Sequence, residues 1–269
     1  SNSVYGDFRD PNDAGSGGSG DNAPAGNGGG LIRIVAQTIQ LDGVIKADGG
    51  NGVACCSAAG GSGGGIRIDV GTLRGTGSIG ANGGSGANSN GGGGGGGRVA
   101  VYYQDATAFN FTTQVSAFGG TRGGDARSQN GGAGTTYLQG PGRENGEIVV
   151  DNNNLDAQLT PIVSPPSNLV SPPTLLVRRT GVVINGANSF FVVSLSSNAL
   201  ITHTPTTATI AGKLDLNVNR ALQVDSLSRI DVTARGFLGG RQLGNPFGGD
   251  GMTVGFQRGS TGLSGGSYG

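Results

Sequence analysis

Few residues of this sequence can do chemistry, and they are scattered. The single histidine, His203, lies in the segment ITHTPTT with no serine or cysteine nucleophile motif near it, so no catalytic triad is indicated and a surface position is expected. Glu144 and Glu147 stand three residues apart in RENGE, where they can be read as the carboxylate pair of a glycosidase. A solvated turn followed by a strand edge explains the two glutamates more simply, and we expect no catalytic residue.

Two acidic loops are candidate calcium sites. Hard cations take six to eight oxygen ligands, which loops rich in Asp, Asn and backbone carbonyls can supply. Neither loop follows the EF-hand pattern or the calcium-binding nonapeptide repeat, and Asx turns account for the same residues. Calcium is therefore the only cofactor for which the sequence offers candidates. They are Asp7, Asp10 and Asp13, with Asn12, in the first loop and Asp151, Asn153 and Asp156 in the second.

The two cysteines, Cys55 and Cys56, are adjacent. Adjacent cysteines can form only a strained vicinal disulfide with each other, so three states are open: that ring, free thiols, or disulfides to a neighbouring subunit. A zinc site closed within one chain is not expected, because zinc takes about four ligands and the pair supplies two.

Composition limits the class of protein that must position these groups. Of 269 residues, 58 are glycine, while the 17 basic and 17 acidic side chains balance. The balance predicts neither nucleic-acid binding nor a polybasic membrane face, and no apolar run approaches the length of a membrane span. Lysine and glutamate are nearly absent, whereas Asn, Thr, Ser and Val abound, which argues against helices almost everywhere. The first residues show no signal peptide, as in a processed or excised chain.

A repeat occupies the first half of the chain. The segment IRIVAQTIQLDGVIKADGGNG, from Ile32, aligns without a gap on IRIDVGTLRGTGSIGANGGSG, from Ile66, at an offset of 34 with 10 of 21 positions identical. A looser third copy keeps Val99 to Val101 and then Val115 to Ala117. Each copy contains a short alternating strand, a middle strand carrying Ile39 or Leu73, and a third strand before a glycine-rich loop.

Repeats of this length bury a core by stacking on one another. Strands in identical order then pair in parallel at equivalent positions. The prediction is an all-β fold, a parallel β-helix or β-solenoid. Arg33 would lie beside Arg67 on the outer face, where a carboxylate such as Asp69 would relieve the repulsion. The predicted ladder residues are Ile32, Ile34, Ile45, Ile66, Ile68, Ile79, Val99, Val101 and Val115.

The glycine-rich loops would leave the same edge of such a stack. One of them is the run Gly91–Gly97, which leads directly into the strand RVAVYY. Glycine segments can lie close together in extended, polyproline-II-like runs and bond from chain to chain, which would make the loops a second packed layer. Flexible loops on an ordered stack are the alternative interpretation.

The sequence divides into four parts by character. Residues 1–140 hold the glycine-rich repeats, and residues 141–174 are an Asn- and Pro-rich connector. Residues 175–238 alternate again as a compact β segment, and 239–269 form a glycine-rich tail. The tail GSTGLSGGSYG reads naturally into the N-terminal SNSVYGDFRD, as in one unit of a head-to-tail series.

The segments GNGGGLIRIVAQTIQLDGVIKADGGNG, GGGGGGGRVAVYYQDAT and GRENGEIVVDNNNL resemble glycine-rich modules of large, repetitive surface or secreted proteins of environmental bacteria. The resemblance covers roughly residues 20 to 155 and, more loosely, 225 to 269. It implies an extracellular or cell-surface location and a structural or adhesive use. The likeness to pectate-lyase-type β-helices is one of architecture alone and implies no active site.

These observations favour a non-enzymatic, self-assembling extracellular protein whose main partner is another copy of itself, joined head to tail in a filament, sheath or adhesive array. A carbohydrate-binding or glycan-cleaving β-helix is the second hypothesis, with surface glycans as partners. An ice-binding solenoid, suggested by THTPTTAT, is the third.

Overall fold

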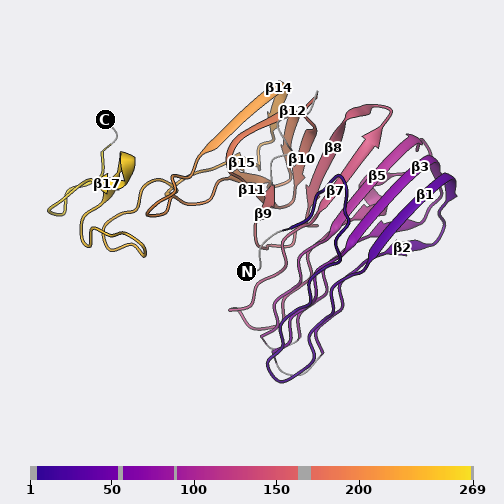
Figure 1. Cartoon of the computed structure of the whole chain (residues 1–269), viewed down its shortest axis with the longest axis horizontal. Helices are drawn as coiled ribbons and strands as arrows, with labels where there is room; N and C mark the ends of the chain where they lie inside the picture. Colours follow the sequence, from indigo (N-terminus) through magenta and orange to yellow (C-terminus); the bar gives the residue numbers. More distant parts are fainter. Residues whose placement is uncertain (1–4, 54–56, 88–89, 163–170, 268–269) are drawn as a thin grey trace.

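The computed structural model describes residues 5–53, 57–87, 90–162 and 171–267. Apart from a four-residue α-helix, α1 (Phe111–Gln114), and a 3-10 turn, η1 (Val254–Phe256), the regular structure of these residues consists of strands. The predicted all-β character with almost no helix is therefore confirmed. Figure 1 shows the strands side by side in one long row, with the glycine-rich segments of the first half extending away from them.

Eight strands form the main sheet. Neighbouring strands pair in parallel everywhere except at β7 and β8, which form an antiparallel hairpin around Pro141 and Gly142. The chain direction therefore reverses once, in the middle of the sheet. In spatial order the strands are β1 (Leu31–Gln40), β3 (Gly65–Arg74), β5 (Arg98–Asp105), β7 (Thr135–Gly140), β8 (Arg143–Asp151), β10 (Thr174–Arg178), β12 (Gly186–Ser196) and β14 (Leu214–Val224).

Two smaller parallel sheets cover the main sheet, one on each face. In β5, Val99 and Val101 share a core with the first small sheet, whereas Ala100 between them shares a core with the second. Since successive strand residues point to opposite faces, the two cores lie on opposite sides of the main sheet. The first small sheet is β2 (Val44–Lys46), β4 (Ser78–Gly80) and β6 (Val115–Ser116); the second is β9 (Thr160–Ile162), β11 (Gly181–Ile184), β13 (Leu200–Thr202) and β15 (Arg229–Ile230).

The change of covered face follows from the hairpin. Crossovers between parallel strands of one sheet keep a single hand. After β7 the strands run in the opposite direction while the sheet continues to grow the same way. The same hand of crossover is then possible only if the connections pass over the other face. None of the sheets formed by the described residues closes on itself.

The repeat offset is the pairing register of the first half. Three columns cross the stack: Ile32, Ile66 and Val99; Ile34, Ile68 and Val101; Ile45, Ile79 and Val115. The expected break before the middle strand is absent, because β1 and β3 each run through it and Ile39 still pairs with Leu73. The alternation of buried and less buried residues in β3 shifts by one position at Gly71. Glycine is required there, because a Cβ would lie 2.6 Å from the carbonyl oxygen of Gln37.

The glycine-rich segments bond to one another. One series of N–H to carbonyl bonds, each 2.8 or 2.9 Å long, links Gly50 to Gly61, Gly84, Gly94, Gly120 and Gly131 in turn. A Cβ at most of these glycines would lie about 2 Å from a backbone oxygen of the neighbouring segment, so only glycine allows the approach. The corner between strands and glycine segments is tied by Asn152, whose amide donates to the carbonyl of Gly131 and accepts from the N–H of Gly119.

The segment 141–174, expected to be a connector, contains two strands, β8 and β9. Pro161 is accommodated because β9 is an edge strand, where a missing ladder donor costs little. Beyond β15 the regular structure of the described residues is the small hairpin of β16 (Met252–Thr253) and β17 (Gln257–Arg258), with η1 between them. Figure 1 shows this tail extending past the end of the sheets.

Candidate functional site

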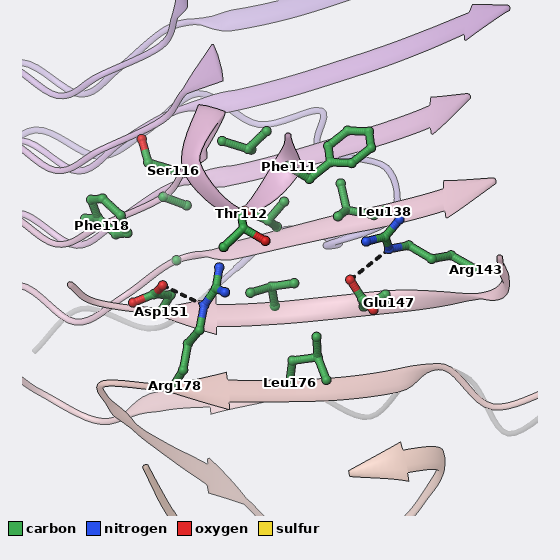
Figure 2. Close-up of a pocket in the computed structure, with 15 residues that line it drawn as sticks. Phe111, Thr112, Ser116, Phe118, Leu138, Arg143, Glu147, Asp151, Leu176 and Arg178 are labelled. Carbon is green, nitrogen blue, oxygen red and sulfur yellow. Dashed lines mark hydrogen bonds and ion pairs between the residues drawn. The ribbon is translucent and has the colours of Figure 1, made fainter. Parts of the chain in front are cut away.

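A small cavity lies where the first covering sheet ends. It has a volume of about 120 Å³ and lies between α1 and β6 on one side and β7, β8 and β10 on the other. Figure 2 shows its floor, with Leu138 and Leu176 between two ion pairs, and Phe111 and Phe118 at its border. The cavity occupies the place where a further strand beside β6 would otherwise continue the covering sheet.

In both ion pairs of the cavity, each charge is balanced by its partner. The Nε of Arg143 lies 2.9 Å from Glu147, and its Nη1 donates to the hydroxyl of Tyr103 at 2.9 Å. Asp151 is buried and pairs with Arg178 at 2.7 Å and also with Arg179. The cavity thus holds no uncompensated charge that would select a charged ligand. Its lining carries three hydroxyl groups, those of Thr112, Ser116 and Thr136.

The two glutamates of RENGE have separate surroundings. Glu144 is exposed and accepts a hydrogen bond from the N–H of Gly142 at 2.8 Å, whereas Glu147 is held by Arg143. Hydrogen bonds from its own N–H and that of Gly142 lower the pKa of Glu144. A glycosidase acid needs a raised pKa to hold its proton at neutral pH. Glu144 therefore lacks the property that this role requires.

His203 is buried, with 6 % of its surface exposed, so the expected surface position is wrong. Its Nδ1 lies 2.7 Å from the carbonyl oxygen of Thr204. Gly212 packs directly on the ring, since a Cβ there would lie 2.5 Å from Nδ1. In ALITHT, Ala199, Ile201 and His203 are buried at every second position, so the alternation of β13 continues past the end of the strand. A search for nucleophile motifs does not use this alternation.

In the first calcium-candidate loop, Asp7 and Asp10 already have partners within the protein. Asp7 accepts from the N–H of Arg9, as an Asx turn does, and Asp10 bridges two arginines. Asp13 lines a groove of about 1090 Å³ that runs along the glycine segments.

In the second candidate loop, the side-chain oxygens of Asp151 and Asn153 are hydrogen-bonded to arginine. Asp151 and Asn153 both accept from Arg179, and the backbone carbonyl of Asp156 accepts from Asn130. Among the described residues, no cluster of three or more His, Asp, Cys or Glu side chains is arranged to hold a metal. Cys55 and Cys56 lie outside the described residues, so their bonding stays a prediction.

The N-terminal segment crosses the face of the first half that no sheet covers. Phe8 packs on Tyr137 with ring centroids 5.5 Å apart, and the hydroxyl of Tyr102 donates to the carbonyl of Arg9. Asp10 lies 3.2 Å from Arg33 and 2.8 Å from Arg67, so a carboxylate separates the stacked arginines. Sequence reasoning missed the packing of this N-terminal segment on the sheet. It treated the acidic residues of DFRDPNDAG as metal ligands, whereas Asp10 pairs with the stacked arginines Arg33 and Arg67.

Within the sheets, exposed large apolar side chains gather at the two ends of the row of strands. Every large hydrophobic side chain that is exposed within a described strand belongs to one of the four outermost strands, β1, β2, β14 and β15. The inner strands expose none. These residues are Leu31, Val35, Val44, Leu222, Val224 and Ile230.

None of the described helices is long and apolar enough to cross a bilayer. Comparison with known proteins adds no assignment: no family model, curated protein or solved structure matches this chain.

Proposed function

We propose that the protein is a structural subunit that associates end to end with copies of itself, forming a filament, sheath or adhesive array at the cell surface. The observation that carries the proposal is the confinement of exposed apolar strand residues to the outermost strands. Exposed, unpaired strand edges are templates for pairing with another chain unless they are blocked. No proline lies in the outermost strands β1, β2, β14 and β15. Their charged side chains, such as Arg33 and Lys46, alternate with the core-facing positions, and the one irregularity of β14 lies between Val218 and Ala221.

The architecture proposed for this subunit is a β-solenoid with a polyproline-II-like glycine layer. Parallel columns at a constant offset support the solenoid. In the glycine segments the donors recur at intervals of three residues, as at Gly60 and Gly63 and at Gly94 and Gly97, and three residues is the repeat of polyproline II. A layer bonded through its backbone is rigid without a large hydrophobic core, which suits a structural part.

A catalytic role has less support. The carboxylates of Glu147 and Asp151 are held by arginines, Glu144 accepts from a backbone N–H, and the one histidine is buried against a carbonyl. We therefore propose no reaction. Glycan binding stays the alternative, because the groove beside the glycine layer is lined in part by polar side chains, among them Arg98, Gln129 and Asn130.

The test is electron microscopy and sedimentation over a range of concentrations, with the double variant Leu222→Lys/Val224→Lys. The variant places two charges at one end of the stack and is expected to abolish assembly while leaving the melting temperature of the subunit nearly unchanged. Ala108→Lys, at an exposed turn after β5, is the matched control and should assemble normally. Monodisperse particles of the unaltered protein at every concentration would overturn the proposal, and retention on polysaccharide columns would then favour glycan binding.

A further inference from the structure

The C-terminal end of the stack exposes positions that are core positions one strand earlier. Leu222, Val224 and Ile230 are 49 %, 43 % and 38 % exposed. Their partners in the preceding strands, Val193, Leu195 and Ile201, are 0 %, 1 % and 0 % exposed. The C-terminal end therefore presents core-type residues with no further strand to cover them, and it is not capped by polar residues.

The N-terminal end has the same character. Ile32, Ile34, Ile39 and Ile45 pack against the core but are only partly buried. Their partners one strand further in, Ile66, Ile68, Leu73 and Ile79, are each fully buried. Both ends thus consist of one long strand and one short strand with half-covered core residues.

The spacing of the inward-facing residues in β1 and β2 resembles that in β12 and β13, the two strands with which β14 and β15 pair. In β1 and β2 the numbers 32, 34, 39 and 45 are separated by two, five and six. In β12 and β13 the buried residues Asn188, Phe190, Leu195 and Ile201 are separated by the same intervals. The inward residue between the second and third members is one position out of step, since it is Ala36 in β1 and Val193 in β12. The strands β14 and β15 pair with that set through Leu216, Val218, Val224 and Ile230, using one irregularity between Phe190 and Val192.

Symmetry decides how a second copy would present this set. Strands β1 and β14 run in opposite directions, and their covering strands lie on opposite faces. A half-turn about the axis along which the strands stack reverses both strand direction and covered face. After that half-turn, β1 of a second copy is parallel to β14 and β2 lies on the same face as β15.

We propose that β14 and β15 of one copy pair in parallel with β1 and β2 of the next, with a half-turn between successive copies. The inference rests on the proposed function and specifies its joint. Both layers continue across the joint, as they do between β12–β13 and β14–β15. The register places Val218 beside Ile34, Val224 beside Ile39 and Ile230 beside Ile45, so that half-buried core residues at both ends become buried.

The register also places two exposed, outward-facing residues side by side, Gln223 of one copy and Thr38 of the next. Neighbouring strands are close enough for a disulfide. Thr38→Cys and Gln223→Cys proteins, mixed and oxidised, should give linked pairs in far greater yield than either protein alone. Mass spectrometry of the linked peptides separates this bond from any bond through Cys55 or Cys56. Asn219→Cys is the matched control, because four residues along the strand place it about 13 Å away.

The outcomes separate the joint from the assembly. Linkage of Thr38→Cys to itself, or equal linkage through Asn219→Cys, in protein that assembles would overturn the half-turn register and leave end-to-end association standing. Assembly without any linkage of the mixed pair would overturn the register as well. If the unaltered protein never assembles, the proposed function fails and the joint fails with it.

Discussion

The seven-glycine run Gly91–Gly97 should respond to alanine with a period of three residues. At Gly94 a Cβ would lie 2.0 Å from the carbonyl oxygen of Gly61, and at Gly96 it would lie 2.0 Å from that of Ala117. At Gly95, between them, the nearest atom is 3.8 Å away, and at Gly92 it is 3.6 Å away. Alanine is therefore excluded at some positions and accommodated at others within one uniform run.

The magnitude follows from the hydrogen bonds around Gly94. Relieving its contact needs a displacement of about 1 Å between two segments. The displacement disturbs the bond from Gly84 to Gly61, at 2.8 Å, and those that Gly94 makes with Gly84 and Gly120, at 2.9 and 2.8 Å. Losing two or three such bonds costs roughly 2–4 kcal/mol of unfolding free energy, which lowers the melting temperature by roughly 5–15 °C.

The control is Gly95→Ala. Its φ lies outside the left-handed region, so alanine reduces the entropy of the unfolded chain without strain, and the unfolding free energy should change by less than about 1 kcal/mol. Denaturant titration and thermal melts of the seven single alanine variants measure the pattern. Equal effects at all seven positions, or none at any, would refute the claim that these glycines form a packed layer.

Three further changes probe other contacts. Asn152→Ala removes one acceptor and two donor bonds of a fully buried amide and should cost roughly 2–4 kcal/mol, measured by denaturant unfolding, while exposed Asn219→Ala changes little. Burial raises the pKa of Tyr102 to about 12, so folding favours the neutral phenol, and its stabilising effect should be complete below pH 10 and disappear as pH rises towards 12. Burial also raises the pKa of Tyr137, so an ultraviolet titration should show late phenolates of both residues, and Tyr102→Phe should remove its own share of them. Hydrogen bonds from Ser228 and from the N–H of Ser197 lower the pKa of Asp225, so its contribution is present at neutral pH and is lost as pH falls through the lowered pKa; Asp225→Asn should flatten the acid limb of a stability–pH curve, and an unchanged limb would contradict the assignment.

The register of the first half is predictable from the sequence because identical spacings repeat in it. Ile32 lies beside Ile66 for the same reason that the two segments align without a gap. The reversal at β7 and β8 is not visible to a repeat search, since it replaces a glycine excursion by the two-residue turn Pro141–Gly142. A proline–glycine pair between alternating segments is a turn signal, and it marks the boundary at which the covered face changes.

The candidate sites were less predictable. Acidic residues in a loop look alike whether they bind a cation or an arginine, and the partners of Asp10 lie 23 and 57 residues away in the sequence. His203 is buried because Gly212 returns across it, a contact that no local pattern contains. The exposed apolar ends, by contrast, follow from the repeat itself, since a stack with similar rungs leaves core-type residues at its outermost strands.

The β7–β8 hairpin also bears on how the chain finds its register. Strands β1, β3 and β5 carry similar core spacings, so a folding chain can pair β1 with β5 as well as with β3, and such a slip by one repeat is a kinetic trap. The hairpin is the only place in the described eight-stranded sheet where neighbouring strands are joined by a tight turn. Local pairing forms fastest, so β7 and β8 are positioned to fold first and to let each half add its strands outwards in order. Pulsed hydrogen exchange should then protect the amides of Tyr137 and Ile148 before those of β1 or β14.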